Sequence, residues 1–219
     1  MSAAAAELHS PDHVVWAGAP LESARAALVL VHGRGATAES MMPLAEAFGR
    51  DDIAYLAPNA SGNVWYPQSF LAPIAANEPW LSSALALIGK LLDRLGANGF
   101  GPERIGLLGF SQGACLCAEY AARNARRYGC IAVLSGGLIG PPGTPRAYPG
   151  SLAGTPVFLG CSDVDFHIPL ERVQESSAVL RGLGAEVDER IYSGMGHTVN
   201  ADEIHAVRAL LASLVGDRA

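Results

Sequence analysis

Short apolar runs alternate with longer segments of helical period along most of this chain, and no other feature constrains the fold as much. Runs that are apolar at every position indicate strands buried on both faces, as in parallel sheets that helices cover on both sides. The sequence therefore predicts an α/β fold with a mostly parallel sheet. The expected strands are Ala27–Val31, Ile53–Ala57, Ile105–Leu108, Ile131–Leu134, Val157–Leu159 and Val187–Tyr192.

Helices are expected between these strands. Leu81, Leu85, Ile88 and Leu92 recur at steps of three and four, which puts one apolar stripe on a helix that ends near Gly96. The other expected helices are 38–48, 111–126, 169–181 and 201–215. Two long connections rich in Gly and Pro, 59–79 and 135–156, are expected to be functional loops over the carboxyl ends of the strands.

The chain of 219 residues fits a single domain, 1–219, in which residues 1–12 are expected to be a flexible N-terminal tail. Its formal net charge is -6 and it has no run of Lys or Arg, which argues against nucleic acid as a partner. No apolar run reaches the roughly 18 residues that a membrane span needs, so stable membrane insertion is not expected. Free buried cysteines and the absence of a secretion signal predict a cytoplasmic protein.

A serine between two glycines follows the strand at 105–108. The segment Gly109-Phe110-Ser111-Gln112-Gly113 is a GxSxG motif that runs into a helix of small residues. In a nucleophile elbow this strand-turn-helix context holds the serine in strained backbone geometry and exposes its hydroxyl at the edge of the sheet. Ser111 is therefore the candidate nucleophile, and the alternative is an ordinary Gly-rich turn.

Such a serine needs a neutral imidazole to take its proton and a carboxylate to orient that imidazole. On α/β-hydrolase sheets the order is Ser, then Asp or Glu, then His. His197 follows the last strand in a Gly-flanked loop and is the candidate base. Asp165, in the loop after the strand at 157–159, is preferred as the acid, with Asp163 as the alternative. His167 is expected to be structural or to line the pocket.

Backbone N–H groups should stabilise the oxyanion of the tetrahedral intermediate. Gln112 opens the helix after Ser111, and Arg34 lies in the loop after the strand at 27–31, so their N–H groups are the expected pair. The Arg34 side chain is expected to be solvated, with attraction of an acidic substrate group as the alternative.

These motifs resemble those of the phospholipase/carboxylesterase family of α/β-hydrolases, which includes acyl-protein thioesterases. The elbow 109–113 and the loop 30–35 are similar to the family's own, although Arg34 stands where an apolar residue is expected. The family pattern places Pro directly after the catalytic Asp. Here Phe166 replaces that Pro, while Ile168-Pro169 match the apolar-Pro pair that follows. The resemblance implies a Ser-Asp-His triad, no metal or other cofactor, and little or no lid.

The expected activity is hydrolysis of short-chain or aromatic carboxylic esters through an acyl-enzyme, with a small-molecule ester as the substrate. A lysophospholipase or acyl-protein thioesterase is the alternative, and a catalytically silent binder of small ligands is a third hypothesis. A homodimer is left open. Apolar side chains in the long connection and beside the acid and base are expected to line the pocket: Trp65, Tyr66, Phe70, Phe166 and Met195.

Overall fold

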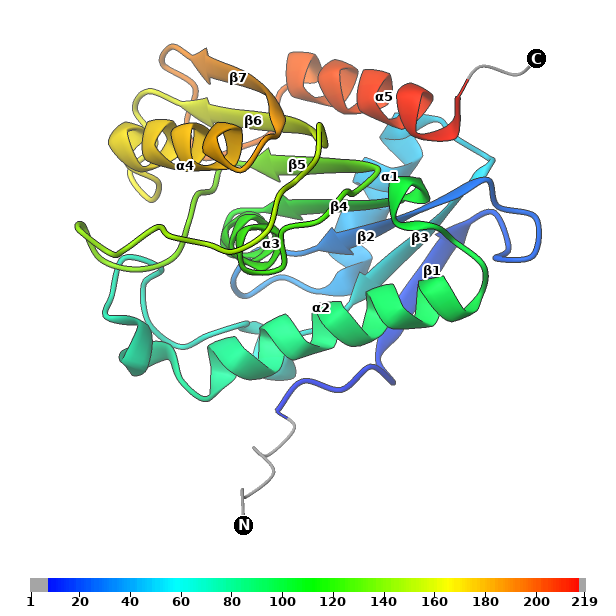
Figure 1. Cartoon of the computed structure of the whole chain (residues 1–219), viewed down its shortest axis with the longest axis horizontal. Coiled ribbons are helices and arrows are strands. Elements are labelled where there is room, and N and C mark those ends of the chain that lie inside the picture. The colour runs from blue at the N-terminus through cyan, green and yellow to red at the C-terminus, as the bar shows by residue number, and fades with distance from the viewer. Residues whose placement is uncertain (1–7, 217–219) are drawn as a thin grey trace.

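A seven-stranded sheet forms the centre of the molecule in a computed structural model, which describes residues 8–216 (Figure 1). The strand order is β1-β3-β2-β4-β5-β6-β7, and all neighbouring strands are parallel except β1 and β3. The strands are β1 (Val14–Gly18), β2 (Ala26–Val31), β3 (Ile53–Pro58), β4 (Ile105–Phe110), β5 (Cys130–Leu134), β6 (Pro156–Ser162) and β7 (Glu186–Tyr192).

Helices cover both faces of this sheet, as the apolar runs predict (Figure 1). Side chains of α2, α3 and α4 join one core cluster on one face, and those of α1 and α5 join a second cluster on the other. The helices are α1 (Met42–Phe48), α2 (Trp80–Ala97), α3 (Gln112–Arg123), α4 (Leu170–Gly182) and α5 (Ala201–Val215), with a 3₁₀ helix (Ala38–Met41) before α1. No helix among residues 8–216 is long and apolar enough to span a bilayer.

The N-terminal segment departs from the prediction of a flexible tail over residues 1–12. The His9 side chain is buried, its Nε2 lies 3.0 Å from the Trp65 carbonyl oxygen, and its Nδ1 accepts from Ser61 N–H at 3.0 Å. His9 N–H also donates to Ser83 Oγ at 3.0 Å. These bonds fix the segment from His9 onward against the 59–79 connection, so the prediction is wrong there. Residues 1–7 lie outside the described part of the chain.

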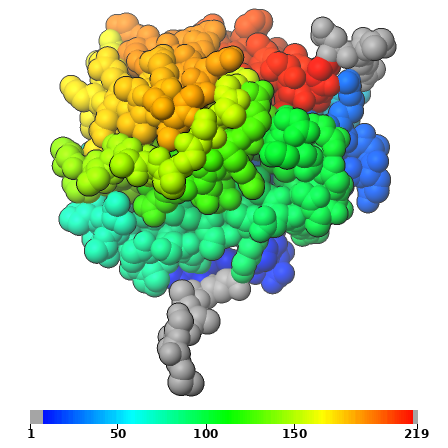
Figure 2. Space-filling model, viewed as in Figure 1, coloured from blue at the N-terminus to red at the C-terminus, as the bar shows by residue number. Residues whose placement is uncertain are grey.

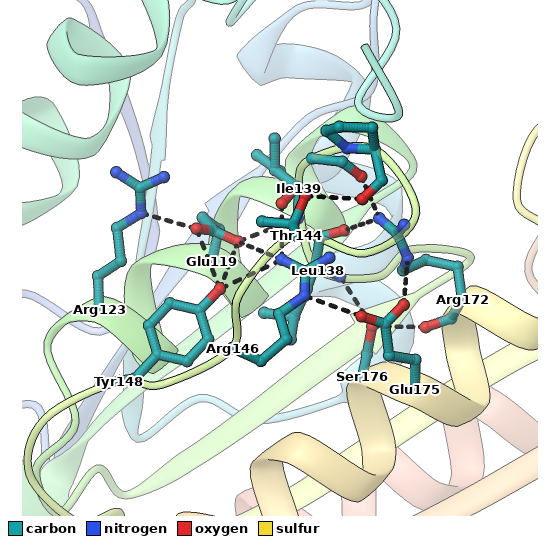
Figure 3. A network of polar contacts seen from close by, with 12 residues as sticks. Glu119, Arg123, Leu138, Ile139, Thr144, Arg146, Tyr148, Arg172, Glu175 and Ser176 are labelled. Atoms are coloured by element: carbon teal, nitrogen blue, oxygen red, sulfur yellow. Dashed lines mark hydrogen bonds and ion pairs between the residues drawn. The ribbon is translucent and has the colours of Figure 1, made fainter. Parts of the chain in front are cut away.

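The connection between β5 and β6 lies between the 59–79 connection and α4, as the yellow-green band in Figure 2 shows. Figure 3 shows the polar network that holds it. Glu119 on α3 is buried, and it accepts from Ile139 N–H at 3.0 Å and pairs with Arg123 at 2.7 Å and with Arg146 at 3.9 Å. Arg172 on α4 donates to two further carbonyl groups of this connection. Because buried charges are costly unless paired, the network fixes the path of the connection.

The two long connections are also bonded directly to each other. Gly140 N–H donates to the Phe70 carbonyl oxygen at 2.7 Å. The network around Glu119 thereby positions the segment that carries Phe70, at the edge of the sheet where the parallel strands end.

Candidate active site

Ser111 lies in the turn between β4 and α3 in a strained conformation, with φ 55° and ψ -119°. Two glycines allow this turn. A Cβ atom on Gly109 would lie 2.3 Å from the Gly113 carbonyl carbon, and one on Gly113 would lie 2.1 Å from the Val31 carbonyl oxygen. Side chains at either position would push the turn away from β2 and α3. The two glycines thus allow the strained turn that the sequence predicts at Ser111.

Ser111, His197 and Asp165 lie in one hydrogen-bonded row, although they are far apart in the sequence. His197 Nε2 is 2.8 Å from Ser111 Oγ, and His197 Nδ1 is 2.7 Å from Asp165 Oδ2. A carboxylate can only accept, so Nδ1 carries the proton and the neutral ring presents its Nε2 lone pair to the hydroxyl of Ser111. This is the arrangement that a general base requires.

The Asp165 carboxylate is buried and held ionised. Burial opposes its charge, but bonds from His197 and from the N–H groups of His167 and Ile168, at 2.9 and 3.1 Å, hold its pKa below the usual range. Asp163, the alternative acid, does not contact His197. Its exposed carboxylate accepts from Gly194 N–H at 2.8 Å and connects the loop after β6 to the loop that carries His197.

The N–H groups of Arg34 and Gln112 have no acceptor among the described residues. Both residues line a cavity of about 530 Å³ that also contains Ser111 and His197. Gln112 is the first residue of α3, where the helix dipole favours negative charge. The two free donors beside the serine therefore have the character of an oxyanion hole.

One wall of this cavity comes from the 59–79 connection, which contributes Tyr66, Pro67, Gln68, Ser69 and Phe70. The Arg34 guanidinium is exposed, but it donates to the carbonyl oxygens of Tyr66, Pro67 and Gln68 at 2.6 to 2.9 Å. Gln112 accepts from Trp65 N–H at 2.9 Å and donates to the Tyr66 carbonyl at 2.8 Å. The two residues that offer oxyanion donors thus also hold this wall.

The predicted pocket residues separate into two groups. Tyr66 and Phe70 line the cavity, whereas Trp65, Phe166 and Met195 do not. The Trp65 ring is fully buried and donates to the His32 carbonyl oxygen at 2.8 Å. Phe166 is 81% exposed and its ring packs at a tilt against that of His167, and Met195 accepts from Asn200 Nδ2 at 2.9 Å.

Sequence reasoning missed several residues of this cavity. Cys115, Ile168 and residues 67–69 line it. His167, which was expected to be structural or to line the pocket, also lines it, with its ring centre 4.7 Å from that of His197. For Ile168 the sequence offered one signal, which is its position directly before Pro169 and after the loop that carries Asp165. Residues 67–69 lie in a long connection without a regular side-chain pattern, so no signal in the sequence marked them.

Known proteins resemble this chain in sequence and in fold. The model of the phospholipase/carboxylesterase family matches residues 15–215. Acyl-protein thioesterase 1 of Gibberella zeae is 28% identical over 216 residues, which cover 85% of this chain and 89% of that protein. The crystal structure of a phospholipase/carboxylesterase from Dyadobacter fermentans has 43% identity and a TM-score of 0.89, over 93% of this chain and 97% of the other.

A carboxylesterase from Bacillus cereus shares the fold, with a TM-score of 0.75 at 19% identity over 92% of this chain and 93% of that one. Sequence and fold thus agree over nearly the whole described chain. The protein belongs to the phospholipase/carboxylesterase family of α/β-hydrolases.

Proposed function

We propose that this protein is a serine carboxylesterase that hydrolyses short-chain or aromatic carboxylic esters, with Ser111 as nucleophile, His197 as base and Asp165 as the acid that orients the base. The observation that carries the proposal is the unbroken row from Ser111 Oγ through His197 to Asp165, with distances of 2.8 and 2.7 Å, at the floor of a cavity. The four cysteines are free and buried, which supports a cytoplasmic location.

In the proposed mechanism His197 Nε2 accepts the proton of Ser111 Oγ while that oxygen bonds to the ester carbonyl carbon. The N–H groups of Arg34 and Gln112 donate to the resulting oxyanion. The bond between the carbonyl carbon and the alkoxy oxygen then breaks, and His197 gives its proton to the departing alcohol. Water, deprotonated by His197, attacks the acyl-enzyme, and the acid is released as Ser111 recovers its proton.

The size and lining of the cavity support small esters. A volume of about 530 Å³ lies within the range of about 300–1,000 Å³ typical of sites for small molecules. Phe70, Tyr66 and Ile168 offer apolar surface to an acyl or aromatic group, while Gln68 and Ser69 are polar. An acyl-protein thioesterase is the second candidate, because a relative aligned over 85% of this chain has that name.

The test is hydrolysis of p-nitrophenyl esters of increasing acyl length, of an acyl thioester and of a lysophospholipid by the wild type and by Ser111→Ala. We expect a maximum at short acyl chains, and loss of activity in Ser111→Ala without loss of the fold. Ser69→Ala, a serine of the same cavity, is the matched control and should stay active. Preference for long acyl chains or for the thioester would favour the second candidate, and an active Ser111→Ala would refute the mechanism.

A further inference from the structure

A second cavity, of about 490 Å³, lies beside the first and has no role in the mechanism above. It extends along the 3₁₀ helix before α1, along α1 itself and over the start of α5. Half of its ten lining residues are Met41, Leu44, Ala47, Val199 and Ile204. Among the described residues that line it, Ser40 alone has a polar side chain and none is charged. We call it the α1 groove.

The α1 groove meets the catalytic cavity at Gly33, Ala36 and Phe110, which line both. Phe110 directly precedes Ser111, and the centre of its ring is 5.0 Å from that of His197. A Cβ atom on Gly33 would lie in ordinary van der Waals contact, 3.4 Å from Phe110 Cδ1 and 3.4 Å from Ser111 Cβ, so Gly33 leaves space for about a methyl group where the two cavities meet. A molecule bound at Ser111 can therefore extend from the catalytic cavity into the α1 groove.

The chemistry indicates which part of an ester would lie there. His197 Nε2 must deliver a proton to the departing oxygen, so the alcohol part of the ester has to lie on the His197 side of the carbonyl carbon. Phe110 packs against the His197 ring, and Val199 is two residues further along the same loop. Both line the α1 groove. The acyl part then lies toward the wall formed by Tyr66 and Phe70.

We infer that the α1 groove is the binding site for an apolar alcohol part of the ester, so that the substrates are esters of medium-length or cyclic apolar alcohols. This inference rests on the proposed esterase function and adds the identity of the leaving group. A chain of several methylene groups fits a groove without charges, because each methylene that is fully buried adds about 0.8 kcal/mol of binding, or roughly fourfold.

The test keeps the acyl group constant and varies the alcohol, with acetates of methanol, butanol, hexanol and octanol as substrates. All of these form the same acetyl-enzyme, so differences in kcat/KM arise while the alcohol is still present. For the wild type we expect kcat/KM to rise about two- to fourfold per methylene until the groove is filled. A series that is flat in the active enzyme would overturn the inference but leave the esterase proposal standing. An enzyme inert toward every ester would instead refute the esterase function itself.

Two variants on α1 locate the effect. Ala47 lines the α1 groove away from the catalytic residues, so Ala47→Met should fill its far end. We expect it to lower kcat/KM for octyl acetate about fivefold or more and to leave methyl acetate within twofold. Because all p-nitrophenyl esters have the same leaving group, the relative preference for acyl length across that series should stay the same. Glu46→Met places a methionine at the neighbouring exposed position, which lies outside the groove. It should leave kcat/KM for all of these substrates unchanged. A change confined to the acyl series in Ala47→Met would assign the groove to the acyl part and contradict the inference.

Discussion

The side chains of Arg34 and Gln112 donate to the same backbone oxygen, the Tyr66 carbonyl. Arg34 lies far before the nucleophile in the sequence, and Gln112 directly follows it. The distances are 2.9 Å from Arg34 Nη2 and 2.8 Å from Gln112 Nε2. Both residues also offer the N–H groups assigned to the oxyanion. The proposed oxyanion donors and the wall of the catalytic cavity are therefore connected through the side chains of the same two residues, so a change in one should alter the other.

Replacing Gln112 by alanine should weaken both the fold and substrate binding. The buried Trp65 N–H would be left without an acceptor, and an unsatisfied buried polar group costs about 1–3 kcal/mol, whereas the Tyr66 carbonyl would lose one donor and keep Arg34. We expect a lower melting temperature and a kcat/KM reduced by about tenfold, because the wall that carries Phe70 loosens. Thermal denaturation and ester hydrolysis measure the two effects. Gln68→Ala removes an exposed glutamine from the same wall and should leave stability unchanged. Equal effects of the two variants would contradict the anchoring role of Gln112.

Conversion to asparagine should affect activity differently at the two candidate acids. In Asp165→Asn the remaining oxygen stays with the N–H groups of His167 and Ile168, so an NH₂ donor replaces the oxygen that accepts from His197 Nδ1, and a loss of about 10³- to 10⁴-fold in kcat is expected with the fold intact. Asp163→Asn keeps an oxygen that can accept from Gly194 N–H, so its activity should stay within a fewfold of the wild type. Steady-state kinetics with one p-nitrophenyl ester suffice. A loss in Asp163→Asn as large as in Asp165→Asn would exclude the assignment.

Thiol reagents should leave the enzyme active, although Cys115 lines the catalytic cavity. Burial raises the pKa of this thiol to about 12, so almost none of it is the reactive thiolate at neutral pH. Burial also raises the pKa values of Cys130 and Cys161 to about 12. Incubation with iodoacetamide followed by assay and mass measurement tests this. Rapid inactivation with one equivalent bound at Cys115 would show that the cavity wall opens, and a fluorophosphonate, which attacks activated serines, provides the positive control.

Strands buried on both faces were predictable because every residue in them is apolar. Strand β4 is such a case, and its prediction needed only an extension of two residues. Strand β1 was missed although Val14-Val15-Trp16-Ala17 is a continuous apolar run, because it lies at the edge of the sheet, pairs antiparallel with β3 and is not followed by a helix before β2. The helix predicted over 38–48 begins as a 3₁₀ helix and becomes α-helical at Met42, since Pro43 lacks the N–H that would continue one helix through this point.

The positions of the site residues could be predicted because each motif directly follows a strand, and parallel strands end at the same edge of the sheet. The conformation of the cavity wall could not be predicted in this way, since it depends on hydrogen bonds between residues distant in sequence. Gln112 and Trp65 are 47 positions apart, and His9 and Trp65 are 56 apart. An aromatic residue in a long loop can face either the cavity or the core. The sequence does not say which, and Trp65 faces the core whereas Phe70 faces the cavity.

A buried carboxyl group near the site makes stability depend on pH. Glu203, in the first turn of α5, is fully buried, and its Oε2 accepts from Asn200 N–H at 2.8 Å while its Oε1 has no partner among the described residues. A Cβ atom on Gly160 would lie 2.2 Å from Oε1, so the carboxyl group packs against the backbone of β6. Burial raises the pKa of Glu203 to about 7, which exceeds its ordinary value of 4.5.

Between these two values the folded state keeps a proton that the unfolded state has lost, so the contribution of Glu203 to stability falls as pH rises from about 4.5 to 7. Glu203→Gln removes this titration. We expect urea denaturation to show that the variant gains stability relative to the wild type, on the order of 2–3 kcal/mol, between pH 4.5 and pH 8. Glu171→Gln, at an exposed acid in the first turn of α4, is the matched control and should follow the wild type. A constant difference between Glu203→Gln and the wild type across this range would show that Glu203 is ionised in the folded protein throughout, with a partner that stabilises its charge.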